Sequence, residues 1–267
     1  MKEKGLTGYQ LKLIGLVLMV FDHIFEFFSY TNRIPIAFRW AGRIVAPIFI
    51  FMTVEGYVHT RSKKKYMLRL YLASILMNMG NLIIPKYFGR VDNVALMNNV
   101  FATLFMILIY LSIVDFIRKA IKEKQIGKVI LGIVLFTIPF VISILIAVAA
   151  SVGKLNVVRL MYIIPTPIFV EGGPVFILLG IIMYLLRENK KNMIIVYSVI
   201  SLAIMLLGEL SLSGIFMRNF QWMMVFAAPF FYLYNGEKGK GAKYLFYVFY
   251  PAHIYTLYIV SCLMMAK

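Results

Sequence analysis

The residues able to do chemistry begin in the first apolar stretch of the chain. Residues 11–28 read LKLIGLVLMVFDHIFEFF and include Asp22, His23 and Glu26. Ionisable side chains are costly at membrane depth and usually mark a transport pathway, a proton relay or a reaction site. Imidazole is the natural general base near neutral pH, so His23 is the candidate base. A carboxylate would orient it, and Glu26 shares its face better than Asp22 does, because adjacent helical positions point about 100° apart.

A second feature of the same stretch is the spacing of Lys12 and His23. Eleven residues make about three helical turns, so both side chains are expected on one face with roughly 16 Å of rise between them. Lys12 lies at the expected inner surface, where it would meet a cytoplasmic anion. A long molecule with a phosphate head and a thioester tip would fit this geometry, although any long helix offers many such pairs.

The other ionisable residues at membrane depth lie in two later stretches. Glu55 and His59 are four residues apart, which places them on one helix face, and His253 lies near the middle of the last apolar run. Arg39 and Arg43 have the same four-residue spacing at the outer start of the second run.

Each of these side chains also has an ordinary structural explanation. A single buried histidine is more often a hydrogen-bonded core residue than a catalyst. His59 lies at a basic boundary where solvation is expected, and Arg39 and Arg43 can extend to lipid head groups. Taken alone, these residues indicate a functional cavity without naming its chemistry.

The elements that must position these side chains are apolar helices. The chain has 267 residues, of which 62% are hydrophobic, and a mean hydropathy of +0.86. A spanning helix needs about 20 mostly apolar residues, which predicts an all-α, multi-pass membrane protein with about nine (8–10) spans around a polar central cavity, in one domain covering residues 1–267. The predicted spans are 10–30, 40–60, 66–84, 97–118, 128–150, 160–187, 192–208, 214–234 and 243–265.

The distribution of charge predicts the orientation of these spans. The net charge is +17, but the basic residues fall in the connections rather than on one soluble face, which disfavours a nucleic-acid partner. Lys2 and Lys4, and the connections at 60–69, 118–128, 187–191 and 235–243, are basic, whereas the alternate ones are poorer in Lys and Arg. The positive-inside rule therefore predicts a cytoplasmic N-terminus, an outer C-terminus and an odd number of spans. Residues 151–175, with three prolines and a glycine pair, are the weak point: they could form one span, two short spans or a re-entrant helix, and two spans would bring the total to ten and the C-terminus inside.

Four stretches of the sequence resemble a known family. They are LKLIGLVLMVFDHI (11–24), GRIVAPIFIFMTVEGYVHTRSKKKYMLRL (42–70), NNVFATL (98–104) and YNGEKGKGAKYLFYVFYPAHIYTLYIV (234–260). Together they resemble the TraX family of membrane acetyltransferases, and the Lys-x10-His pattern resembles the signature of the wider acyltransferase-3 superfamily. Where that superfamily tends to have Ser-Gly, this chain has Glu55-Gly56, which leaves a serine-based role at this position unsupported.

The resemblance implies transfer of an acetyl group from cytoplasmic acetyl-CoA, at the bacterial cell membrane, to an acceptor on the outer side. The acceptor is left open among the N-terminal amine of pilin, an envelope sugar hydroxyl or amine, a lipid head group and a small amine. The catalytic residues are then expected to be His23, Asp22, Glu26, Glu55 and His253, with His253 donating to the oxyanion or assisting proton transfer. The residues expected to bind acetyl-CoA, several of them through its phosphates, are Lys12, Arg43, His59, Arg61, Lys63, Lys64, Lys65 and Arg69.

Three other classes of protein remain as alternatives. A secondary transporter or flippase would also carry intramembrane charges and a proline-broken helix, but no inverted repeat is detectable in the sequence. A structural or assembly protein would use polar residues only to hold helices together. A zinc enzyme would need ligands from several helices, since Glu55 and His59 are the one short-spaced pair, and no metal is expected.

Overall fold

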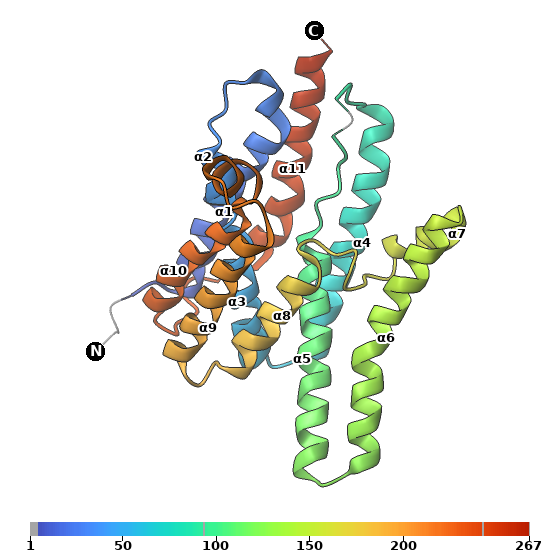
Figure 1. Ribbon diagram of the computed structural model, residues 1–267, viewed down its shortest axis with the longest axis vertical. Coiled ribbons are helices and arrows are strands. Elements are labelled where there is room, and N and C mark those ends of the chain that lie inside the picture. The colour runs from blue at the N-terminus through green and yellow to red at the C-terminus, as the bar shows by residue number, and fades with distance from the viewer. Residues whose placement is uncertain (1–4, 93, 242, 267) are drawn as a thin grey trace. The chain divides into compact units, whose positions relative to one another are not determined.

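The computed structural model describes residues 5–92, 94–241 and 243–266, and within them it is helical with no strand (Figure 1). Lys2 and Lys4, which contribute to the predicted orientation, lie outside the described residues. The prediction of an all-α protein is confirmed. Among the described residues, an isolated β-bridge pairs Leu6 with Tyr234.

The chain divides into two compact units. Unit 1 contains the residues up to Met52, Ile83–Leu96 and those from Leu185 onward, and unit 2 contains Thr53–Leu82 and Met97–Tyr184. The single domain predicted from the sequence stays a prediction. The helices α3 (Val45–His59) and α4 (Lys63–Tyr87) each run from one unit into the other.

Unit 1 is built on its first helix. Helix α1 (Gly8–Phe28) begins at Thr7, whose hydroxyl accepts a hydrogen bond from the Gln10 amide while the Gln10 side chain accepts one from the Thr7 amide. This reciprocal capping satisfies amides at the start of the helix and fixes its first turn. Around α1 the unit contains η1 (Ser29–Thr31), α2 (Ala37–Gly42), α9 (Lys190–Ala203), η3 (Ile204–Leu207), η4 (Gly214–Arg218), η5 (Phe220–Ala227), α10 (Ala228–Leu233) and α11 (Lys243–Met265).

Helices α1 and α11 pack in parallel. The contacts advance together along both helices: the Lys12 ammonium lies 5.5 Å from the centre of the Phe246 ring, and the Phe27 ring centre lies 5.7 Å from that of Tyr258. The odd number of spans and the count of nine stay predictions.

The far ends of α1 and α11 are joined by a buried arginine that follows α4. Only 2% of the Arg90 side chain is exposed, and its guanidinium donates to the Phe27 carbonyl at 3.0 Å and to the Ser261 hydroxyl. Asp92 accepts two further bonds from it at 2.9 and 2.6 Å, and these bonds hold the pKa of Asp92 below its usual value. Arg90 therefore fixes the register of the two helices.

Unit 2 contains a long helical hairpin. Helices α5 (Val100–Lys122) and α6 (Ile126–Ser151) lie side by side, joined by a short turn in which Lys124 has a left-handed φ of 55° (Figure 1). Gly132 lets the two helices approach, since a Cβ there would lie 2.3 Å from the Ile117 side chain. The outward face of α6 exposes a continuous set of large apolar side chains, which suits contact with lipid: Ile130, Leu131, Ile133, Val134, Ile138, Val141, Ile144, Leu145 and Val148.

Six helices within the described residues are long and apolar enough to cross a membrane, which fits a multi-pass membrane protein. They cover Ala37–His59, Lys63–Tyr87, Val100–Lys122, Ile126–Ser151, Lys190–Leu207 and Tyr244–Met265. The predicted first span corresponds to α1, which carries Lys12, Asp22 and Glu26 and is not among the six. The count of nine is therefore not confirmed.

Two of the predicted spans are not continuous helices. The stretch 160–187 consists of η2 (Arg159–Tyr162), which follows the short α7 (Leu155–Val158), then a largely non-helical segment, and then α8 (Gly173–Leu185). Pro165 and Pro167 lack the backbone N–H that a helix interior uses, which favours an interruption here, and Gly172 has a left-handed φ of 73°. The stretch 214–234 divides into η4, η5 and α10, of which Phe220–Leu233 forms a shorter apolar helix.

Where the helix is interrupted after η2, polar side chains of α4 in the same unit donate hydrogen bonds to the backbone. The Tyr71 hydroxyl donates to the Ile163 carbonyl at 3.1 Å, and the Asn78 amide donates to the Tyr162 carbonyl at 2.6 Å. Backbone groups that lose their helical partners at membrane depth need such replacements.

Candidate active site

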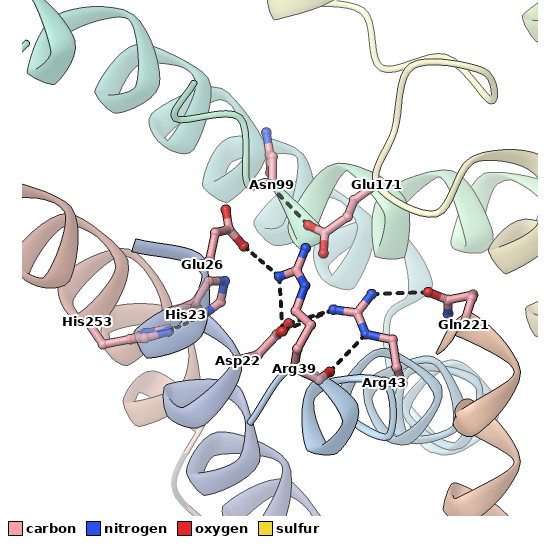
Figure 2. A network of polar contacts seen from close by, with 9 residues as sticks. All are labelled: Asp22, His23, Glu26, Arg39, Arg43, Asn99, Glu171, Gln221 and His253. Carbon is pink, nitrogen blue, oxygen red and sulfur yellow. Dashed lines mark hydrogen bonds and ion pairs between the residues drawn. The ribbon is translucent and has the colours of Figure 1, made fainter. Parts of the chain in front are cut away.

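Two histidines from opposite ends of the sequence meet in unit 1. The Nδ1 atom of His23 on α1 lies 3.0 Å from Nε2 of His253 on α11, and the ring centres are 4.9 Å apart (Figure 2). His23 is buried, with 5% of its surface exposed. The His253 ring stacks on Phe249 at 4.9 Å, and its Nδ1 lies 2.7 Å from the Phe249 carbonyl oxygen. The structure thus brings together two residues expected to be catalytic.

The carboxylates of α1 pair with two arginines of the next helical segment. Arg43 reaches both oxygens of Asp22 through Nη2, at 3.1 and 2.9 Å. Nη1 of Arg39 donates to Asp22 at 3.0 Å and to Glu26 at 3.2 Å (Figure 2). Two guanidinium groups therefore face two carboxylates, and the four charges cancel.

Sequence spacing and a glycine explain why these four side chains meet. Asp22 and Glu26 are four residues apart on α1, and Arg39 and Arg43 are four apart at the end of α2, so each pair shares a helix face. Gly42 lies against Asp22, where a Cβ would come within 2.2 Å of the carboxylate carbon. The network continues into η5, because Nη1 of Arg43 donates to the Gln221 side chain at 3.1 Å.

This arrangement changes the expected role of the carboxylates. The sequence suggests that Asp22 or Glu26 orients His23, but both have ion pairs with arginine at the distances given above. Both carboxylate oxygens of Asp22 accept from Arg43, so the negative charge of Asp22 is largely compensated by an arginine. The His23 ring also lies within hydrogen-bond distance of the His253 imidazole.

Lys12 lies on the same side of α1 as His23. Lys12 lies against Phe246 and His23 against His253, and both partners belong to α11. The shared face predicted from the eleven-residue spacing is therefore what the structure contains.

Glu55 and His59 belong to unit 2 and share a helix face there. Nδ1 of His59 lies 2.9 Å from the Glu55 carbonyl oxygen and 3.9 Å from a carboxylate oxygen of the same residue. The His59 side chain is 70% exposed, which fits the solvated boundary position expected for it.

The basic stretch 61–69, also in unit 2, contains cations in three different states. Lys63 pairs with Asp115 at 2.6 Å and lies 4.0 Å from the centre of the Tyr57 ring. Arg61, Lys64 and Lys65 are exposed. Arg69 stacks on Tyr66, with 5.6 Å between its guanidinium carbon and the ring centre, and its buried Nε has no hydrogen-bond partner within the described part of the chain.

Sequence reasoning missed several residues of these networks. Extension to lipid head groups is one interpretation of Arg39 in the sequence, whereas in the structure Arg39 bridges two carboxylates. Its four-residue spacing from Arg43, matched to that of Asp22 and Glu26, was a usable signal. Asp115 was detectable as an acid inside an apolar run. Gln221 gave no such signal, and neither did Asn99, whose backbone N–H donates to a Glu171 carboxylate oxygen at 3.3 Å in unit 2 (Figure 2).

Among the described residues, no three histidine, cysteine, aspartate or glutamate side chains lie close enough together to hold a metal ion.

Comparison with known proteins extends over nearly the whole chain. The chain is 23% identical over 268 residues to the probable fimbrial assembly protein FimC, serogroup H1, of Dichelobacter nodosus, covering 94% of each protein. No solved structure matches the chain. The sequence model of the TraX protein family matches residues 7–261, and the chain therefore belongs to the TraX family.

Proposed function

We propose that this TraX-family protein is a membrane acetyltransferase that moves an acetyl group from cytoplasmic acetyl-CoA to an acceptor at the outer side of the bacterial cell membrane. Its N-terminus would lie in the cytoplasm, as the basic connections favour. The family and the name of the fimbrial relative support a membrane protein concerned with pilin.

The observation that carries the proposal is the pair of imidazoles, of which His23 is buried and His253 partly buried. Acyl transfer needs a group that removes a proton from the acceptor as it attacks the thioester carbonyl. In the proposed reaction His23 takes that proton, the acceptor oxygen or nitrogen bonds to the acetyl carbon, and the carbon–sulfur bond breaks. The departing thiolate then takes the proton back from His23, so that the protein ends the cycle unchanged.

The charges beside this pair suit a proton acceptor. Asp22, Glu26, Arg39 and Arg43 balance one another, so His23 is not held permanently protonated by an unpaired carboxylate. Fixed dipoles and paired charges in a site of low dielectric also need little reorganisation during reaction.

Each unit, considered by itself, contains cations that could bind a phosphate group. In unit 1, Lys12 lies three turns before His23 on the same side of α1. In unit 2, the exposed Arg61, Lys64 and Lys65 offer positive charge, whereas the Nε atom of Arg69 is buried. Lys63 fits this role less well, because Asp115 already holds its ammonium group.

The acceptor we favour is the N-terminal amine of pilin, because the relative is named a fimbrial assembly protein. A neutral amine attacks through its lone pair and loses a proton as the carbon–nitrogen bond forms, and removal of that proton is the step assigned to His23. An envelope sugar would require the same proton removal from a hydroxyl group.

The direct experiment is transfer of label by the purified protein. The protein in nanodiscs is incubated with acetyl-CoA labelled in the acetyl group and with an extract of membranes and envelope, and the labelled product is identified. We expect label on one acceptor, together with one free CoA thiol for each acetyl group transferred. Binding of acetyl-CoA without any labelled product, or no binding at all, would contradict the proposal.

A secondary transporter is the second candidate, and the broken segment in unit 2 favours it. Discontinuous helices commonly form substrate sites in transporters, and residues after η2 are held out of helical geometry by Tyr71 and Asn78. A transporter would carry an intact substrate across the bilayer of a proteoliposome without release of CoA thiol.

A further inference from the structure

The hydrogen bonds of the histidine pair determine which nitrogen of each ring carries a proton. The Phe249 carbonyl oxygen can only accept, so Nδ1 of His253, 2.7 Å away, must donate to it. A neutral His253 then has its lone pair on Nε2. That atom faces Nδ1 of His23 at 3.0 Å, so Nδ1 of His23 is the donor of this bond.

The same bond decides where the basic nitrogen of His23 lies. A neutral His23 with its proton on Nδ1 carries its basic lone pair on Nε2.

We propose that His253 is the positioning residue that fixes this tautomer of His23, a claim that rests on the proposed function. In a Ser-His-Asp triad a carboxylate holds the catalytic imidazole in its tautomer and orientation. Here Asp22 is held by two arginines and Glu26 pairs with one, and a second imidazole takes that place. His253 does not touch the substrate; it acts through His23.

The surroundings of His253 suit a fixed acceptor. Its ring is stacked on Phe249 with 19° between the ring planes, and the Phe249 carbonyl holds Nδ1. Ring contact and hydrogen bond come from the preceding turn of the same helix, so the direction of Nε2 is set before a substrate arrives. When His23 gains a proton at Nε2, its Nδ1–H bond to His253 becomes charge-assisted and shorter.

The wild-type protein offers a test that does not depend on activity. The chain has three histidines, so selective ¹⁵N-labelling of histidine gives three imidazoles in an NMR spectrum, and the exposed His59 serves as an internal reference. Single substitutions assign the signals. In both His23 and His253 we expect Nδ1 to be protonated and Nε2 to be unprotonated. A proton on Nε2 of either residue at neutral pH would overturn the proposal.

A pair of substitutions then tests the positioning role. In His253→Gln the amide oxygen can still accept from Nδ1 of His23, whereas in His253→Phe a ring of similar size cannot. We expect kcat of acetyl transfer to fall about 100-fold in His253→Phe and to be largely rescued in His253→Gln. The KM for acetyl-CoA should not change in either variant, because His253 orients the base and does not bind the donor.

Equal loss of kcat in both variants, with the His23 tautomer unaltered, would show that His253 acts in another way. The two proposals fail separately. A wild-type protein that transfers no acetyl group contradicts the enzymatic function, while the NMR spectrum decides the tautomer independently. A wild-type protein that transfers acetyl but carries the opposite tautomer contradicts this inference alone.

Discussion

The two units each contain a carboxylate that is paired with a cation on apolar helices, and the clusters differ in what surrounds the pair. In unit 2, Asp115 accepts from the Lys63 ammonium at 2.6 Å, from the Tyr57 hydroxyl at 2.8 Å and from the Tyr184 hydroxyl. In unit 1, Asp22 and Glu26 accept from arginines, and two imidazoles lie beside them.

The difference distinguishes a cluster that holds helices together from a cluster that can exchange a proton. A carboxylate surrounded by ammonium and phenol donors holds helices together, because these donors keep their protons near neutral pH. Imidazole gains and loses its proton in that range. Charge pairing alone therefore does not identify a reaction site; the imidazole pair in unit 1 distinguishes one cluster from the other.

Removing an arginine from unit 1 tests the charge network with the largest expected effect on stability. Arg43→Ala leaves Asp22 with one partner and Gln221 without its donor. Breaking a partly buried ion pair on one side costs about 3 kcal/mol, which unfolding by denaturant in detergent would measure. Arg43→Lys is the matched control, since it keeps the charge and loses the two-oxygen contact, and it should lose less. A loss below about 1 kcal/mol in Arg43→Ala would mean that the network does not hold the helices.

The corresponding change in unit 2 should affect stability alone. Asp115→Asn keeps the shape of the side chain and removes its charge, and we expect it to cost about 1–2 kcal/mol. Acetyl transfer per folded molecule should stay at the wild-type level, because Asp115 is assigned only to anchoring. A fall in transfer greater than the fall in folded protein would remove the distinction between the two clusters.

Some helices of the two units could be predicted from the sequence more accurately than others. Apolar runs located α1, α4, α5, α6 and α11 to within a few residues, and Pro165 and Pro167 marked the break in unit 2. The subdivision of 214–234 was not predicted, because its apolar residues are compatible with α, 3₁₀ and π turns alike. Local composition therefore predicts where helices occur better than where they are interrupted.

The candidate site shows the same limit. The spacing of Lys12 and His23 predicted their common face because both lie on one helix. The contact of His23 with His253 joins positions 230 residues apart, and Arg39 joins Asp22 across a chain reversal. Such pairings depend on helix packing, which no spacing within a single helix encodes.

The basic stretch of unit 2 provides the prediction with the smallest expected effect. Reversing the charge of its exposed cations, Arg61, Lys64 and Lys65, should raise the KM for acetyl-CoA about fivefold, since each exposed charge contributes less than about 1 kcal/mol. Lys63→Gln should leave KM unchanged and lower stability, because Lys63 pairs with Asp115. An unchanged KM in the triple variant would leave these cations as a signal for membrane orientation only.

The central claim is that the His23 imidazole accepts the proton in acetyl transfer, and one comparison of rates tests it most directly. Release of CoA thiol and labelling of the acceptor are measured for the wild type, His23→Ala and Tyr110→Phe, at equal amounts of folded protein. Tyr110 is a suitable control because it is fully buried in unit 2 and would lose a single hydrogen bond to the Phe136 carbonyl. We predict that His23→Ala loses acetyl transfer by about 10²-fold or more while Tyr110→Phe retains it. Transfer at the wild-type rate by folded His23→Ala would contradict the account.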